Sequence, residues 1–154
     1  MNKIIIKQLT NVYFEEAVNL VLKAKLDTKE EIEHHLIHID AHYVALDKGR
    51  VIGLIGWYQD KVNYANEVMG KKFPGEKAYW VGFFVVDEKY RGQGIGYALL
   101  KKLEKIIKEK RVNELWVSSV PETKDYYIRQ GFKVIMSGKI SGNTKFFCVK
   151  KLTF

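Results

Sequence analysis

Residues 81–100 read VGFFVVDEKYRGQGIGYALL, and this stretch decides the fold. Its first six residues form an apolar run typical of a buried strand, and a charged turn follows them. The run RGQGIG at 91–96 comes next, and a helical pattern then continues to about residue 110. A strand that leads through a glycine-rich turn into a helix predicts an anion site. The N–H groups of the first helical turn have no partner within the helix, and the helix dipole attracts negative charge.

Two well-known phosphate loops do not match this turn. A Rossmann fingerprint begun at Gly92 would need glycine at position 97, where the chain has Tyr97. The P-loop string G-x-x-x-x-G-K-[ST] does not occur in the chain. What remains is R-x-x-G-x-G, from Arg91 to Gly96. For this string alone, the alternative to a phosphate site is a glycine-rich turn that only reverses the chain.

A second motif, YIRQGF at 127–132, has the form Y-x-x-x-G-F. Its surroundings predict a short helix from about residue 122 that ends at Gly131, since glycine is the usual residue for a left-handed helix end. Phe132 would then open a strand. The two motifs occur in a fixed order, each with a matching local structure.

Together these motifs resemble those of the GNAT superfamily of N-acetyltransferases. The resemblance covers the whole chain in layout, while its specific residues lie in 84–97 and 127–132. It implies an α+β fold in which about four helices flank a mixed, mostly antiparallel sheet with a splayed central strand pair. The expected organisation is a single N-acetyltransferase domain over residues 1–154.

The resemblance also implies acetyl-coenzyme A as the acetyl donor. Backbone groups of Phe84, Val85 and Val86 would pair with its pantetheine arm. The phosphates would lie on the N–H groups of Gly92, Gln93, Gly94, Ile95, Gly96 and Tyr97. Arg91 matches the first position of the motif, and the alternative is a surface arginine that closes the turn.

For the chemistry, the resemblance assigns Tyr127 as the general acid that protonates the departing thiolate. The N–H of Val86 would stabilise the oxyanion. A packed tyrosine with a structural role is the alternative for Tyr127. Tyr126 points about 100° away on a helix and is the weaker candidate.

The general base is not identified by the sequence. The strand at 79–86 holds no carboxylate, although family members often use a glutamate there. Nearby acidic residues are better explained as surface charges; they are Glu76, Asp87, Glu114, Glu122 and Asp125. Val120 is a second departure, because many members have asparagine at that position.

Histidines at 34, 35, 38 and 42 suggest a metal site at first sight, but we interpret them as a histidine-rich surface helix end and expect no metal. Cys148 is expected to be a small core residue. Residues 59–77 are expected to form a long polar connection, flanked by aromatic residues such as Trp80 and Phe83 that would wall the acceptor side.

The chain of 154 residues carries a formal charge of +8, with lysines crowding the helix after the glycine turn. This face is solvated, attracts the anionic cofactor, or binds nucleic acid. Nucleic acid is the least favoured partner, since the helix has no interleaved base-stacking aromatics. No run is long enough for a membrane span or a signal peptide, so we expect a cytoplasmic protein.

The expected function is an acetyl-coenzyme A-dependent N-acetyltransferase that passes acetyl directly to a primary amine. The alternative is a non-catalytic module of the same fold that binds coenzyme A as a sensor or scaffold. The sequence identifies neither the amine-bearing acceptor nor the oligomeric state, and a homodimer stays open.

Overall fold

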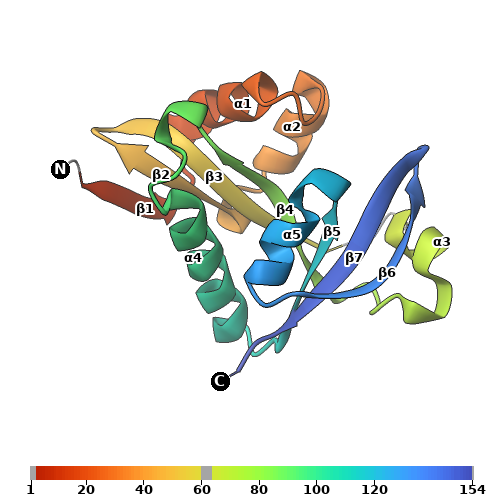
Figure 1. Cartoon of the computed structure of the whole chain (residues 1–154). Helices are drawn as coiled ribbons and strands as arrows, with labels where there is room; N and C mark the ends of the chain where they lie inside the picture. The colour runs from red at the N-terminus through yellow and green to blue at the C-terminus, as the bar shows by residue number, and fades with distance from the viewer. Residues whose placement is uncertain (1–2, 60–63, 154) are drawn as a thin grey trace. The chain divides into compact units, whose positions relative to one another are not determined.

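The computed structural model describes residues 3–59 and 64–153. Its contacts divide the chain into two compact units, each of which is described by itself. Unit 1 comprises residues 1–57 and 82–105, and unit 2 comprises 58–81 and 106–154. Seven strands follow the order β1-β2-β3-β4-β5-β7-β6, labelled in Figure 1. The division passes through β4 (Tyr79–Val86) and through α4 (Ile95–Glu109).

Unit 1 is built on an antiparallel set of strands with two helices packed against it. The strands are β1 (Ile4–Gln8), β2 (His42–Asp47) and β3 (Arg50–Tyr58). The helices are α1 (Phe14–Lys23) and α2 (Lys29–Leu36), which Figure 1 shows side by side. Three short 3₁₀ turns complete the unit: Asn11–Tyr13, Ile39–Ala41 and Glu88–Tyr90.

Different helices cover the two faces of β2 and β3. On one face, Val44, Leu54 and Val85 pack in a single core with the buried sides of α1 and α2. On the other face, Gly53 faces α4 so closely that an added Cβ would lie 2.9 Å from Cδ1 of Leu99. The missing side chain at Gly53 therefore lets α4 approach the sheet.

Unit 2 packs around the fully buried indole of Trp80. Its strands are β5 (Glu114–Ser119), β6 (Lys133–Ile140) and β7 (Asn143–Lys151), and its helices are α3 (Tyr64–Met69) and α5 (Pro121–Arg129). Ring centroids of four aromatic neighbours lie 5.6–6.5 Å from that of Trp80; they are Trp116, Phe147, Tyr58 and Phe73. The pairing of β4 with β5 is parallel and joins Tyr79 to Leu115 and Trp80 to Trp116.

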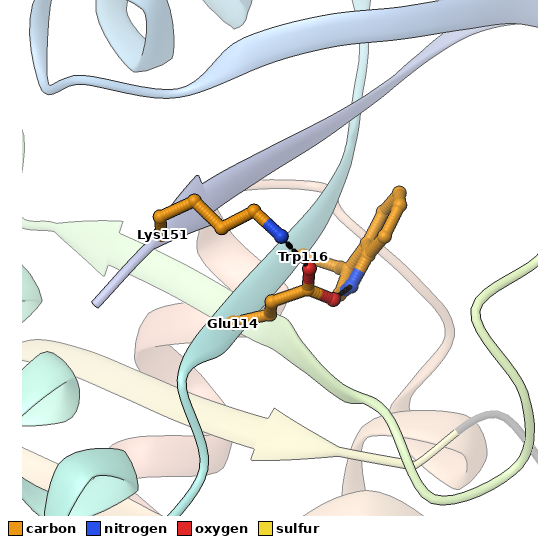
Figure 2. A network of polar contacts seen from close by, with 3 residues as sticks. All are labelled: Glu114, Trp116 and Lys151. Atoms are coloured by element: carbon orange, nitrogen blue, oxygen red, sulfur yellow. Dashed lines mark hydrogen bonds and ion pairs between the residues drawn. The ribbon is translucent and has the colours of Figure 1, made fainter. Parts of the chain in front are cut away.

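One polar network joins β5 to β7 at their paired ends, and Figure 2 shows its three residues. Glu114 accepts a hydrogen bond from Nε1 of Trp116 at 3.2 Å and forms an ion pair with Lys151. Because the lysine side chain is largely exposed, the ion pair adds little to stability. The network nevertheless means that the Glu114 carboxylate already has two partners, Trp116 and Lys151.

Helix α5 ends in a Schellman motif. Gly131 has a left-handed φ of 98°. The N–H of Gly131 donates to Ile128 O and the N–H of Phe132 donates to Tyr127 O, both at 3.0 Å. The rings of Tyr127 and Phe132 supply the accompanying apolar contact, with centroids 5.3 Å apart. The tyrosine, the glycine and the phenylalanine of the second motif thus share one structural task.

The α+β fold with a mixed, mostly antiparallel sheet is confirmed. Thr28 is the N-cap of α2, and its Oγ1 accepts from the N–H of Glu31 at 3.2 Å. The prediction of a long connection at 59–77 is wrong. Residues 60–63 lie outside the described part of the chain, but α3 and the 3₁₀ turn Gly70–Lys72 follow them. With α3, the described residues hold five α-helices where about four were expected. The buried Ala65 and Met69 of α3 stand four residues apart, a helical spacing that the sequence already contained.

The Trp80 indole should dominate the stability of unit 2. Replacing Trp80 with alanine removes a fully buried side chain and leaves a cavity, so we expect a loss of about 3–5 kcal/mol in the free energy of unfolding. Urea unfolding followed by circular dichroism measures it. Val12→Ala is the control, because Val12 is 81% exposed and its truncation should change stability by about 0.5 kcal/mol or less. Similar losses in both variants would contradict the central role of Trp80.

A second stability test concerns Gly131. Alanine at this left-handed position should cost about 1–2 kcal/mol. The new Cβ would also lie 3.2 Å from Cε of Lys150, although that flexible side chain can move. Gln130→Ala is the matched control, since Gln130 has φ of −85° and carries no such strain. Equal thermal stability of the two variants would argue against the Schellman motif.

Candidate active site

The glycine turn leaves open space above its backbone. Gly92 and Gly94 have φ of 78° and 81°, and a Cβ added to either would meet no atom within 4 Å. Helix α4 begins at Ile95, and the N–H of Ala98 donates to Gly94 O at 3.0 Å. The preceding N–H groups therefore belong to the unpaired first turn of the helix. This geometry fits a phosphate group.

The predicted turn residues differ in how far they are exposed. Arg91, Gly92, Gln93, Gly94 and Tyr97 are exposed, and Gly96 is half-buried. The side chain of Ile95 is buried in the core, so only its backbone can serve a ligand. The guanidine Nε of Arg91 donates to Val86 O at 3.3 Å, which supports the alternative that this arginine closes the turn.

The segment before the turn is anchored by contacts that the sequence did not reveal. The hydroxyl of Tyr90 donates to Oδ2 of Asp47 at 2.7 Å, and this bond raises the pKa of Tyr90. Asp47 is itself buried at the end of β2. The N–H of Asp87 donates to Ile52 O at 2.8 Å, and Oδ1 of Asp87 accepts from the N–H of Lys89 at 3.0 Å. No local motif connects Asp47 with Tyr90, because 43 residues separate them.

The backbone of β4 alternates in direction along the predicted cofactor edge. The backbone N–H of Asp87 donates to Ile52 O of β3. Backbone groups two residues apart face the same side of a strand, so the N–H and C=O of Val85 also face β3, where Val85 O lies close to Gly53. Phe84 and Val86 consequently direct their backbone groups away from β3. They are the better placed of the three residues to pair with a ligand.

Tyr127 is 6% exposed, and its ring packs against those of Phe132 and Tyr126. Burial is the main cause that raises the pKa of Tyr127 above its ordinary value, and Tyr126 and Cys148 add to the effect. Its hydroxyl therefore keeps its proton at neutral pH, and the raised pKa makes it a weaker acid than an ordinary tyrosine. Cys148 is buried in the core as predicted, and burial raises the pKa of its thiol to about 11.

The end of β5 explains the departure at Val120. Val120 is the N-cap of α5, and Pro121 occupies the first helical turn. Ser119 Oγ lies 2.9 Å from Oγ1 of Thr123 and donates to Val120 O at 2.8 Å. Val120 has no polar side chain with which to bond a cofactor, so this edge differs from the pattern the resemblance implied.

The acidic residues considered as bases stay outside β4. Asp87 accepts from Lys89, and Glu114 is held by Trp116 and Lys151. Glu76, Glu122 and Asp125 are exposed. Surface or local structural roles account for all of them.

The prediction of a histidine-rich surface is wrong for His42, which is 4% exposed. Its ring covers Gly56 so closely that an added Cβ there would lie 2.6 Å from Nε2. Nδ1 of His42 lies 2.9 Å from His38 O, so this nitrogen carries the proton and donates it. The sequence did not reveal that Gly56 makes room for a buried His42, because the two residues meet only when β2 pairs with β3.

Two other kinds of feature are absent from the described residues. Over 3–59 and 64–153, no group of three or more His, Cys, Asp or Glu side chains is placed to hold a metal ion. None of the helices in that same part of the chain has the length and apolar character to cross a membrane.

Comparison with known proteins gives consistent results. The model of the acetyltransferase (GNAT) family matches residues 6–132. An uncharacterized N-acetyltransferase of Chlorobaculum tepidum is 28% identical over 132 residues, which cover 84% of this chain and 68% of the relative. A GNAT-family acetyltransferase structure from Staphylococcus aureus Mu50 has a TM-score of 0.73 at 18% identity, covering 98% of this chain and 100% of that one. A chain of the NatC complex bound to Gag peptide and CoA has a TM-score of 0.75 at 19% identity, covering 98% and 99%. The chain belongs to the acetyltransferase (GNAT) family.

Proposed function

We propose that this protein is an acetyl-coenzyme A-dependent N-acetyltransferase that transfers acetyl directly to a primary amine. The observation that carries the proposal is the open glycine turn at the start of α4, directly after β4. Family membership supports acetyl transfer in general. The coenzyme A in the related NatC structure supports the donor, and the name of the Chlorobaculum relative supports an amino acceptor.

Each part of the proposed reaction has a group suited to it. The backbone N–H groups at 92–97 bind the pyrophosphate, and the start of α4 adds its positive dipole. Phe84 and Val86 bind the pantetheine arm through backbone groups, and the N–H of Val86 stabilises the oxyanion as the amine attacks. Tyr127 donates its proton to the departing thiolate.

The alternative function is a coenzyme A-binding module without catalysis. Two observations favour it: β4 holds no carboxylate, and Val120 offers no side-chain hydrogen bond. The two functions separate in one assay, in which free thiol is measured with acetyl-coenzyme A and a panel of amines. The panel should contain spermidine, L-glutamate and a tetrapeptide with a free N-terminus, the last because the related NatC structure holds a peptide. Binding without amine-dependent thiol release would favour the module.

Binding of the donor should depend on the open space at Gly94. Gly94→Glu places bulk and negative charge there, so the rise in melting temperature that acetyl-coenzyme A gives the wild type should vanish. Gly142→Glu is the matched control, because Gly142 also has a φ of 81° and open space around it, but it lies in the turn between β6 and β7. An undiminished rise in Gly94→Glu would place the donor elsewhere.

The hydroxyl of Tyr127 should act in the chemical step. Tyr127→Phe keeps the ring in the Schellman contact, so the fold should survive. We expect kcat to fall by about 10²–10⁴-fold, or roughly 3–5 kcal/mol of barrier, with little change in donor affinity. Tyr126→Phe should cost much less, since the neighbouring residue points in another direction. A Tyr127→Phe enzyme within a few-fold of wild type would mean that water or another residue protonates the thiolate.

A further inference from the structure

A base is the one group that the proposed reaction lacks. An alkyl amine has a pKa of about 10.4 and is mostly protonated at neutral pH, so protons must leave its nitrogen during acetyl transfer. Strand β4 has no carboxylate, and Asp87 and Glu114 are held in local contacts. We infer that His35, on α2, is the general base, an assignment that rests on the proposed acetyl transfer.

The position of His35 is the first support. Its ring packs edge-on against Phe83 of β4, with centroids 5.4 Å apart and planes at 88°. Phe83 directly precedes Phe84, whose backbone is proposed to bind the donor. Helix α2 thus carries an imidazole to the same strand on which the reaction is proposed to occur.

The accessibility of His35 is the second support. The residue is half-buried, whereas His42 is almost fully buried and its Nδ1 is bonded to His38 O. Within residues 3–59 and 64–153, no hydrogen bond engages either ring nitrogen of His35. A neutral imidazole in this state has one lone pair available to accept a proton.

The electrostatic surroundings are the third support. Burial is the largest cause that lowers the pKa of His35, and the nearby imidazoles of His34 and His38 lower it further. Glu31 and Asp27 oppose this effect without reversing it. His42, from β2, also lies within electrostatic range of His35. These surroundings favour the neutral form of the His35 ring, which is the form able to take a proton.

The charge around His35 also suits an amine. The chain as a whole is basic, with a formal charge of +8. Around the start of α2, however, acidic side chains outnumber the single Lys29; they are Asp27, Glu30, Glu31 and Glu33. This local negative charge attracts an ammonium group, whereas the lysines of α4 suit the anionic donor.

Acetyl transfer from a protonated amine releases one proton overall. A protonated amine loses one proton to water, and its lone pair then attacks the thioester carbon. His35 takes a second proton from the nitrogen, which becomes much more acidic once the C–N bond forms. The C–S bond breaks, and the thiolate takes the proton of Tyr127. Solvent then removes the proton from His35 and returns one to Tyr127, so that the products are the amide, free coenzyme A thiol and one proton released.

The test compares wild type with His35→Gln across pH, using acetyl-coenzyme A and the amine panel named above. The ratio of their kcat/KM values at each pH cancels the titration of the amine itself. We expect wild type to exceed the variant by about 10²–10⁴-fold above pH 7. The ratio should fall toward one as pH drops through the lowered pKa of His35, because the protonated ring cannot act as a base.

Two further variants make the outcome decisive. His34→Gln changes an exposed histidine on the same helix and should keep nearly the wild-type activity above pH 7. Its activity should begin to fall at a higher pH than that of wild type, because the His34 imidazole lowers the pKa of His35. His35→Ala should recover activity when imidazole is added, which a purely structural role would not predict. A ratio near one at every pH, with amine acetylation retained, would overturn the base assignment and leave the proposed function standing. No acetylation of any panel amine by wild type would overturn both.

Discussion

The left-handed backbone at Gly92 and Gly94 is the constraint on which the candidate site depends. A residue with a Cβ resists positive φ, so glycine lets the chain leave β4 and enter α4 in a few residues at the least conformational cost. The same conformation keeps side chains away from the first N–H groups of α4. The buried Ile95 then anchors the helix start to the core. One backbone geometry accordingly serves both the chain reversal and the anion site.

Around this turn, structural and functional roles overlap in the same residues. Arg91 closes the turn through Val86 O, although it also matches the first position of the motif. Tyr90 and Asp47 tie the preceding segment to the β2–β3 hairpin through a 2.7 Å hydrogen bond. In unit 2, Tyr127 is part of the Schellman motif through its carbonyl and its ring, so only its hydroxyl remains to be explained by chemistry. A tyrosine-to-phenylalanine change is informative for this reason, because it leaves the structural role intact.

Charge is distributed unevenly along the chain. The lysines of α4 follow the turn proposed for the phosphates, whereas acidic residues gather at the start of α2, where Asp27 and Glu31 act on His35. Part of the basic face is neutralised, since Lys101 pairs with the buried Glu104 at 3.3 Å. These local charges say more about the two proposed substrates than the net charge does, because fields from separate surface charges are screened over about 8 Å in physiological salt.

The sequence by itself determined the features that depend on neighbouring residues. These are the span of β4, the glycine turn, the left-handed end at Gly131 and the family resemblance. Each rests on the intrinsic conformational preference or hydrogen bonding of a few residues along the chain. It missed α3, because the helix is only six residues long, shorter than the window over which a helical period becomes clear.

Only the tertiary structure decided the features that join distant residues. It buried Trp80 among aromatic rings from several elements, placed His42 over Gly56 and brought His35 against Phe83. It also joined Asp47 to Tyr90 and engaged Glu114 with Lys151. The physical reason is that strand pairing and helix packing set these distances, and neither is encoded in any short segment. Local preference therefore gave the turn and its motifs, while packing chose which side chains can meet a substrate.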